Sequence, residues 1–278
     1  MRFASKNGDK DSASSKYNFS KISDRYQSIE QVQEALREAG LEQSNLIVGV
    51  DFTRSNTWAG KVSFNGRCLH DTCGTPNPYQ QVISIVGRTL EAFDDDQYIP
   101  AFGFGDSLTT DKSCFPFYPD RPCQGLQDVL DRYTEIAPGI ELSGPTNFAP
   151  ILEKAVAIVK ETNSYHILVL IADGQVTNEE ETINALVKAS SFPLSVIMVG
   201  VGDGPWDMMK RFDDELPERR FDNFQFVCFS KLQQLILEQQ RAAPENRMSA
   251  AKADAYFATA MLMEVPEQYQ AIRRLRLL

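Results

Sequence analysis

The polar and apolar positions of this chain follow two alternating periods. Continuous apolar runs of strand length recur along it, which is typical of strands buried on both faces. These predicted strands span residues 46–51, 98–103, 167–172, 194–200 and 224–229. Between them, apolar positions recur at helical spacing over residues 79–93, 125–136, 148–160, 179–190 and 206–212. The alternation predicts an α/β fold, with a doubly wound, mostly parallel, Rossmann-like sheet flanked by helices.

The N-terminal part lies outside this alternation. Residues 1–20 are rich in Ser, Lys, Asp and Asn and have no periodicity, so they predict a disordered leader. Residues 21–45 form an N-terminal extension with one predicted helix. Ser28 is placed to cap its start, and Gly40 is placed to end it.

The remaining chain divides into one domain and one extension. We expect the domain over residues 46–240 and a helical extension over residues 241–278, with a further helix at 249–264. The basic and apolar residues 272–278 leave two alternatives, a frayed end and a tail that binds a partner. A short extended piece at residues 61–64, followed by Asn-Gly, predicts a hairpin and an antiparallel edge strand.

The composition sets limits on function. The chain has 278 residues, 42% of them hydrophobic, which is enough for one large domain with a buried core. The formal net charge of -10 argues against nucleic acid or an anionic membrane as the main partner. No apolar run reaches the roughly 18 residues that span a bilayer, so we expect no direct membrane insertion. The first residues also lack the apolar core of a signal peptide.

The cysteines and histidines limit the metal chemistry. The chain has 5 Cys and 2 His, and we expect the cysteines to be reduced intracellular thiols. Cys68, His70 and Cys73 resemble part of a zinc site but lack a nearby fourth ligand. A two-zinc RING module needs about eight Cys or His ligands, more than this chain contains.

Oxygen-bearing side chains follow two of the predicted strands and precede one helix. Asp51 ends a strand and is followed by Thr53 and Ser55 at alternate positions. Thr146 lies in a loop before a helix, and Asp173 ends another strand. The ligand sites of open α/β sheets lie at the carboxyl ends of the strands, so we expect these segments to converge. Carboxylate and hydroxyl oxygens suit a hard cation such as Mg²⁺.

An enzymatic alternative uses the same strand end. Phosphatases of the haloacid dehalogenase type also place a strand-terminal Asp on Mg²⁺, but they need a second Asp two residues later as the general acid and base. Thr53 occupies that position here, and a hydroxyl cannot do this work. Asp106, after another strand, is either a second layer of the metal site or a solvated loop residue.

Several motifs together resemble a known family. They are residues 51–56 (DFTRSN), 75–79 (TPNPY), 144–150 (GPTNFAP), 171–177 (IADGQVT), 199–206 (VGVGDGPW) and 221–227 (FDNFQFV). This set resembles the copine-type von Willebrand factor A domain over residues 20 to 270. The segment 34–41 (EALREAGL) is more similar to plant RING-domain ubiquitin ligases that carry this domain.

The resemblance implies a metal-ion-dependent adhesion site and a non-catalytic role. Its metal ligands would fall on Asp51, Thr53, Ser55, Thr146 and Asp173. The ion would be Mg²⁺, or else Mn²⁺ or Ca²⁺, completed by an Asp or Glu carboxylate from a protein partner. We expect a divalent-metal-dependent interaction protein in the cytoplasm, with the nucleus or a partner-mediated plasma membrane position as alternatives. The alternative function is the substrate-recruiting part of a ubiquitin ligase, with the ubiquitination machinery as partner.

Overall fold

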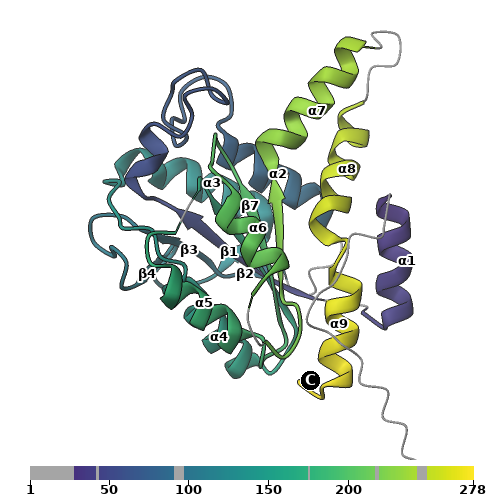
Figure 1. The fold of residues 1–278 in the computed structure, drawn as a ribbon. Coiled ribbons are helices and arrows are strands. Elements are labelled where there is room, and N and C mark those ends of the chain that lie inside the picture. Colours follow the sequence, from purple (N-terminus) through teal and green to yellow (C-terminus); the bar gives the residue numbers. More distant parts are fainter. Residues whose placement is uncertain (1–27, 42–43, 91–96, 175, 217–218, 243–248) are drawn as a thin grey trace, which may run out of the picture.

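A six-stranded sheet forms the centre of the protein (Figure 1). The structure is a computed structural model. It describes residues 28–41, 44–90, 97–174, 176–216, 219–242 and 249–278. The expected leader at residues 1–20 therefore lies outside the described residues.

The strand order in this sheet is β4-β3-β1-β6-β7-β8, and all neighbours pair in parallel except β3 and β4. The strands are β1 (Asn45–Asp51), β3 (Ala101–Phe104), β4 (Cys114–Pro116), β6 (His166–Ala172), β7 (Leu194–Gly200) and β8 (Phe224–Cys228). Two further strands, β2 (Tyr98–Ile99) and β5 (Cys123–Gln124), form a separate antiparallel pair. The predicted fold class, a mostly parallel α/β sheet, is confirmed.

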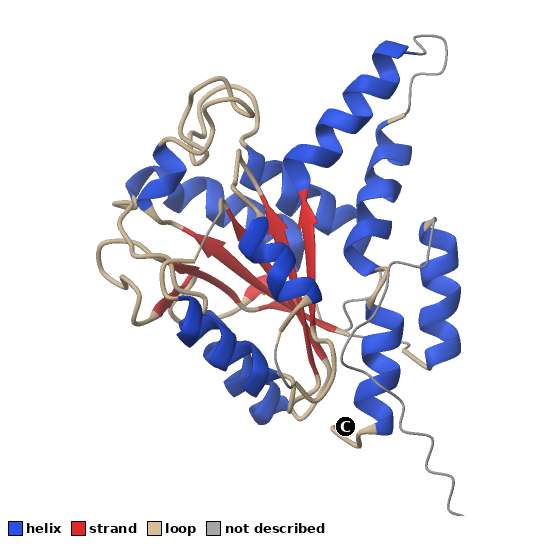
Figure 2. Cartoon of the chain, in the orientation of Figure 1, coloured by secondary structure: helices blue, strands red, loops and turns tan. Residues whose placement is uncertain are grey.

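Helices cover both faces of the sheet (Figure 2). One face packs on α2 (Pro78–Leu90), α3 (Gly125–Ile136) and α8 (Ala250–Leu262), and the other on α4 (Ala149–Thr162), α5 (Glu179–Ala189) and α6 (Asp207–Asp214). The sequence of β6 is apolar throughout because both faces of this strand are buried. Val169 and its alternate neighbours enter the first core, whereas Leu168 and Leu170 enter the second.

The terminal helices α1 (Ile29–Ala39) and α9 (Val265–Arg274) lie side by side, and α7 (Phe229–Ala242) precedes α8 (Figure 1). Ser28 accepts a hydrogen bond from the backbone of Gln31, and Gly40 adopts the left-handed conformation, so both predicted caps of α1 are confirmed. Arg273 of α9 donates a hydrogen bond to the Ala39 carbonyl. Neither alternative expected for residues 272–278, a frayed end or a tail that binds a partner, holds for Ile272, because this residue is fully buried in α9.

Two predicted strands need correction. The strand expected at residues 98–103 is two strands, because Pro100 has no N–H to continue the ladder, although its carbonyl accepts a bond from Val48. The hairpin expected at residues 61–64 is wrong, because these residues lie in turns. Asn65 and Gly66 take left-handed conformations, as Asn-Gly favours, but close a loop instead of a hairpin. The antiparallel edge strand is β4.

Within the part of the chain that the structure describes, no helix combines the length and apolarity needed to cross a bilayer.

Candidate metal centre

The centre is built from the loop that follows β1. Asp51 is the last residue of β1 and is fully buried. Its Oδ1 accepts a hydrogen bond of 2.8 Å from the backbone N–H of Thr53, which turns the chain sharply after the strand. A short 3-10 helix, η1 (Arg54–Thr57), follows at once and carries Ser55. The side chains of Thr53 and Ser55 are thereby brought together, with 2.9 Å between Oγ1 and Oγ.

Asp173 joins this group from the end of β6. The Ser55 hydroxyl donates a hydrogen bond of 2.9 Å to Asp173 Oδ1. Since the Ser55 proton is used in this way, Thr53 is the donor in its contact with Ser55. β1 and β6 are adjacent and parallel, so their carboxyl ends meet at one edge of the sheet.

The loop that carries Thr146 contacts the loops that carry the other candidate ligands. The Thr146 carbonyl accepts a hydrogen bond of 2.8 Å from the backbone of Thr177, in the loop that follows Asp173. Ser143, in the same loop as Thr146, pairs with Thr53 as an isolated parallel bridge. Thr146 is 7% exposed, and in the described residues its hydroxyl makes no hydrogen bond with the other candidates.

Each of the two carboxylates of the centre has one oxygen without a hydrogen-bond partner among the described residues. Among the described residues, Asp51 Oδ2 and Asp173 Oδ2 are buried without a hydrogen-bond partner. Burial raises the pKa of Asp51 to about 6. Burial, reinforced by the charge of Asp51, raises the pKa of Asp173 to about 8. Buried carboxylate oxygens are normally paired, and this arrangement favours either protons or a cation between the two groups.

The donor set suits a small hard cation. Two carboxylates and three hydroxyl-bearing residues offer only oxygen atoms, the ligands that Mg²⁺ and Ca²⁺ prefer. Within the described residues, no cluster holds three or more His, Cys, Asp or Glu in a metal-binding arrangement. A cation here would therefore rely on hydroxyls and water as well as on the carboxylates.

A layer of buried neutral groups supports the end of β1. Asn56 donates hydrogen bonds to the carbonyls of Asp51 and Thr53, at 3.3 and 3.0 Å. Its own amide oxygen accepts a bond of 2.7 Å from the Tyr79 hydroxyl of α2. The layer thus ties the candidate ligand loop to a helix. Asn56 and Tyr79 end two of the motifs noted in the sequence, but their contact was not predicted, because the loop and the helix are separated along the chain.

His70 completes this layer. Its Nε2 lies 2.8 Å from the Asp51 carbonyl, and its Nδ1 lies 2.8 Å from the Tyr133 hydroxyl of α3. A carbonyl only accepts, so Nε2 carries the proton and Nδ1 accepts from Tyr133. Burial lowers the pKa of His70 to about 3, which keeps the ring neutral. The ring stacks between Phe52 and Tyr79, with centroid distances of 4.5 and 4.2 Å.

Two other candidates have structural roles. Both ring nitrogens of His70 are engaged, so they are not directed at a metal shared with Cys68 and Cys73. Asp106 is not a solvated loop residue, because it is 5% exposed. Its carboxylate accepts hydrogen bonds from the backbone of Thr109 and Leu108, which fixes the loop after β3.

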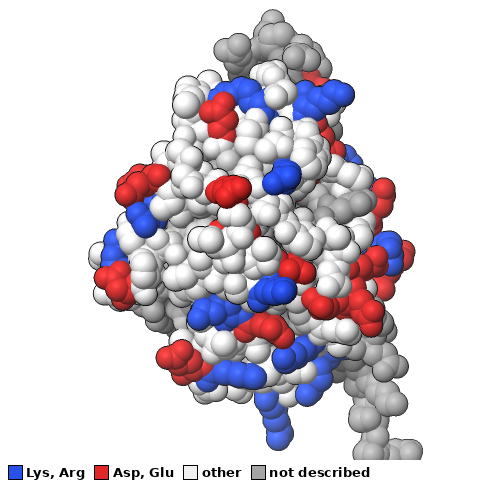
Figure 3. Space-filling view, turned by 90° about the vertical axis from the view of Figure 1, so that its left-hand side faces the viewer, with Lys and Arg blue, Asp and Glu red and all other residues white. Residues whose placement is uncertain are grey.

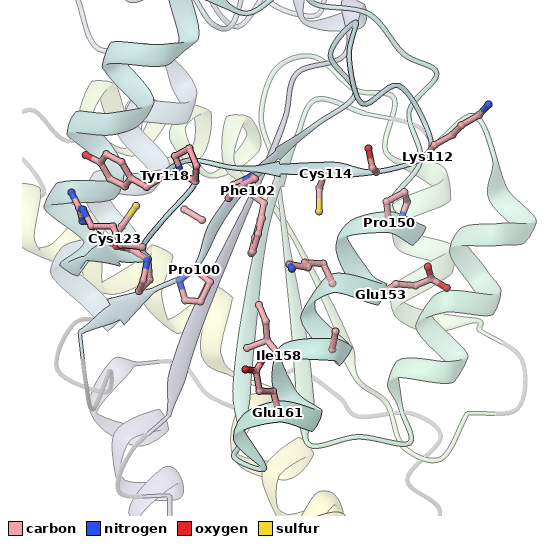
Figure 4. A pocket seen from close by; sticks show the side chains of 18 residues that line it. Pro100, Phe102, Lys112, Cys114, Tyr118, Cys123, Pro150, Glu153, Ile158 and Glu161 are labelled. Carbon is pink, nitrogen blue, oxygen red and sulfur yellow. Dashed lines mark hydrogen bonds between the residues drawn. The ribbon is translucent and has the colours of Figure 1, made fainter.

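A groove of about 730 Å³ lies away from the centre, between β4 and α4 (Figure 4). Phe102 and several prolines are among its lining residues. Burial raises the pKa of the two thiols in its wall, Cys114 and Cys123, which makes them poor nucleophiles. None of the five candidate metal ligands is among its lining residues.

The sheet order and the two helical layers form the α/β architecture that the resemblance to a copine-type von Willebrand factor A domain implies. The sequence matches the copine family over residues 68–278. The chain belongs to this family.

The relatives include plant and animal proteins. The chain is 52% identical over 274 residues to the E3 ubiquitin-protein ligase RGLG1 of Arabidopsis thaliana, covering 94% of this chain and 54% of that protein. It is 49% identical over 258 residues to Copine family protein 2 of Caenorhabditis elegans, covering 91% of this chain and 3% of that protein. The chain thus spans about half the length of the ligase.

Among solved structures, the chain is similar to a von Willebrand factor type A protein from Catenulispora acidiphila, with a TM-score of 0.46 and 12% identity over 72% of this chain and 42% of that one. It is also similar to the manganese-loaded TRAP protein of Plasmodium vivax, with a TM-score of 0.44 and 14% identity over 70% and 72%. Similarity of this size carries no information about ligands.

Proposed function

We propose that this chain is a non-catalytic protein-interaction domain that docks its partner through a bound divalent cation. The observation that carries the proposal is the pair of buried carboxylate oxygens without partners, Asp51 Oδ2 and Asp173 Oδ2, at the ends of adjacent strands. A cation between them would replace the missing hydrogen bonds and remove the repulsion between the two charges.

The ligand set determines how a partner would bind. Thr53, Ser55 and Thr146 would supply neutral hydroxyl oxygens, while Asp51 and Asp173 would act directly or through water. With Mg²⁺, or Mn²⁺ or Ca²⁺, such a set leaves positive charge at the ion and room for one more ligand. An Asp or Glu carboxylate of a protein partner fits both the charge and the oxygen preference.

The neighbouring groups do not favour hydrolysis. His70 is neutral, and both of its nitrogens are engaged below the centre. Thr53 stands where a phosphatase of the type considered above needs its second Asp. Binding without turnover is therefore the chemistry that this centre supports best.

Calorimetric titration with Mg²⁺ tests the proposal. We expect wild type to bind Mg²⁺ and Asp51→Ala to lose binding. Asp128→Ala is the matched control, because Asp128 is a carboxylate on α3 that forms an ion pair of 2.7 Å with Arg121. Equal heats for wild type and Asp51→Ala would contradict the proposal.

A second function is favoured by the plant relatives. We propose as the alternative that the chain is the substrate-recruiting part of a ubiquitin ligase, because it is 52% identical to a protein that bears that name but spans 54% of its length. Sequencing the gene beyond the codon for Leu278 tests this. A downstream Cys/His cluster of RING type supports it, and a stop codon directly after Leu278 argues against it.

We propose the cytoplasm as the place of action, because the cysteines are free thiols, as in proteins of a reducing compartment. Imaging of a fluorescent fusion checks this, and a signal confined to a secretory compartment would contradict it.

A further inference from the structure

We infer that the partner of this centre is a peptide segment in which the metal-binding Asp or Glu is flanked by bulky apolar side chains. The inference rests on the metal-dependent docking proposed above and adds the class of partner. It is carried by three of the most exposed large apolar residues of the described chain, here called the apolar rim: Trp58, Val62 and Leu108, with exposed fractions of 61%, 82% and 89%.

The apolar rim lies on the loops around the candidate metal centre. Trp58 lies three residues after Ser55, and its backbone N–H bonds to the Ser55 carbonyl at 2.9 Å. Leu108 lies in the loop after β3, on the opposite side of β1 from β6. That loop is held beside the centre, because Ser107 bonds to the Glu141 carbonyl and Asp106 pairs with Leu142.

Val62 reaches the far side of the centre. The loop after β1 extends to the end of β7, where the Asp203 carboxylate accepts bonds of 2.8 Å from the backbone of Val62 and of Ser63. The Asp203 N–H in turn donates to the Ala59 carbonyl at 2.7 Å. Since β6 separates β1 from β7, the apolar rim lies on both sides of the strand ends that carry Asp51 and Asp173.

These side chains are presented on ordered loops. Asp106 fixes the backbone of Leu108, and Asp203 fixes the backbone of Val62, each through hydrogen bonds from backbone N–H groups to a carboxylate. Holding an apolar side chain in water on a fixed loop does not stabilise the monomer. Exposed apolar side chains around a candidate binding site are a surface that a partner can cover, and Trp58 is the type of residue that most often anchors one.

The charge pattern favours local recognition of a single carboxylate. Figure 3 shows the left-hand side of the molecule in Figure 1, where Lys, Arg, Asp and Glu are interspersed on the described residues, and much of the middle is uncharged. Arg54, between two candidate ligands, is exposed and adds positive charge beside the centre. An acidic residue with apolar neighbours complements both the positive charge at the centre and the apolar rim around it. The open apolar rim suits a peptide better than an acyl chain, which needs an enclosed tunnel.

A displayed library of short peptides with one fixed central Asp tests the inference. The full chain is used as bait in Mg²⁺, and bound peptides are eluted with EDTA. We expect the eluted peptides to be enriched in Leu, Ile, Phe and Trp next to the fixed Asp. A synthetic peptide from the selection should then bind Trp58→Ser and Leu108→Ser about tenfold more weakly than wild type. Tyr256→Ser, which alters an exposed aromatic residue on α8, should bind within about twofold of wild type.

Mg²⁺ binding is measured separately on every variant. If the rim variants bind Mg²⁺ like wild type but also bind the peptide like wild type, the inference is wrong and metal-dependent docking stands. If wild type binds no Mg²⁺, the proposed function fails first. Elution of peptides without apolar enrichment, or rim-dependent binding of octanoate in place of the peptide, would also overturn the inference.

Discussion

At the scale of single residues, the burial of Asp51 and Asp173 makes the ionised form of the pair unfavourable in the metal-free fold. Both are buried, and their pKa values in the fold, about 6 and about 8, lie above the ordinary value of 3.8. At pH values between 3.8 and these raised pKa values, the folded state holds protons that the unfolded chain has released. Ionising the pair in the fold therefore opposes folding unless a cation replaces the protons.

This predicts a specific pH dependence without metal. Below about pH 4 the two carboxyls are protonated in both states, so their full contribution to stability is present. As the pH rises to about 8, the free energy of unfolding in EDTA should fall, by up to about 1.4 kcal/mol per pH unit for each proton held. Urea unfolding at several pH values measures it. Asp173→Asn should show a shallower fall, and saturating Mg²⁺ should remove most of it. Identical slopes in wild type and Asp173→Asn would contradict the assignment.

The buried layer beneath Asp51 leads to a second prediction. Tyr79→Phe removes the hydroxyl that bonds to Asn56, whose amide in turn holds the Asp51 and Thr53 carbonyls. We expect a loss of about 1–2 kcal/mol in stability and a roughly tenfold weaker Mg²⁺ affinity. Tyr165→Phe is the matched control, because it removes a buried hydroxyl bonded to Ser195 at the opposite ends of the strands. The layer would have no positioning role if both variants kept wild-type Mg²⁺ affinity by calorimetry.

At the scale of elements, long buried strands were predictable, and short exposed ones were not. β6 and β7 have continuous apolar runs, and their predicted bounds agree with the structure to within one residue. β4 has three residues that are half-buried or exposed, so no apolar run marks it. Its pairing depends on β3, which the sequence cannot show by periodicity alone.

The candidate site also has a part that the sequence predicts and a part that it does not. Its oxygen-bearing residues follow strand ends and loops, so the sequence pattern indicates where they meet. The residues that support Asp51 come from segments that only the tertiary fold brings together, as His70 and Tyr133 do across 63 positions of sequence. Neither spacing nor composition predicts such a contact.

The helix α9 supports a prediction at this scale. Ile272 is fully buried in the core that α9 shares with the sheet, whereas the nearby Leu278 is 49% exposed. We expect Ile272→Ala to destabilise the protein by about 2–4 kcal/mol because it leaves a cavity. Leu278→Ala should change stability by no more than about 0.5 kcal/mol. Chemical denaturation compares the two, and equal small effects would show that α9 is detached in solution.

At the scale of the whole molecule, the described terminal helices α1, α8 and α9 and the sheet form one packed unit. α1 contacts α8 and α9, and α8 contacts α2 on the same face of the sheet. Buried residues of α1, such as Leu36, belong to the same hydrophobic core as Val48 and Val169 of the central strands. The extensions at either end are therefore expected to unfold together with the sheet rather than as independent units.

The last prediction follows from this shared core and from the position of the metal centre. Trp58 and Trp206 are the 2 tryptophans of the chain, and both lie in loops at the carboxyl edge of the sheet. Their fluorescence should report the end that binds metal, whereas the far-ultraviolet circular dichroism is dominated by the helices. A ligand that binds only the folded state stabilises the whole cooperative unit. At Mg²⁺ about a hundredfold above its Kd, both signals should shift together, by roughly 2.7 kcal/mol in the free energy of unfolding. If only the fluorescence transition moved, the metal end would be a separate folding unit, and the helical extensions would not share its stability.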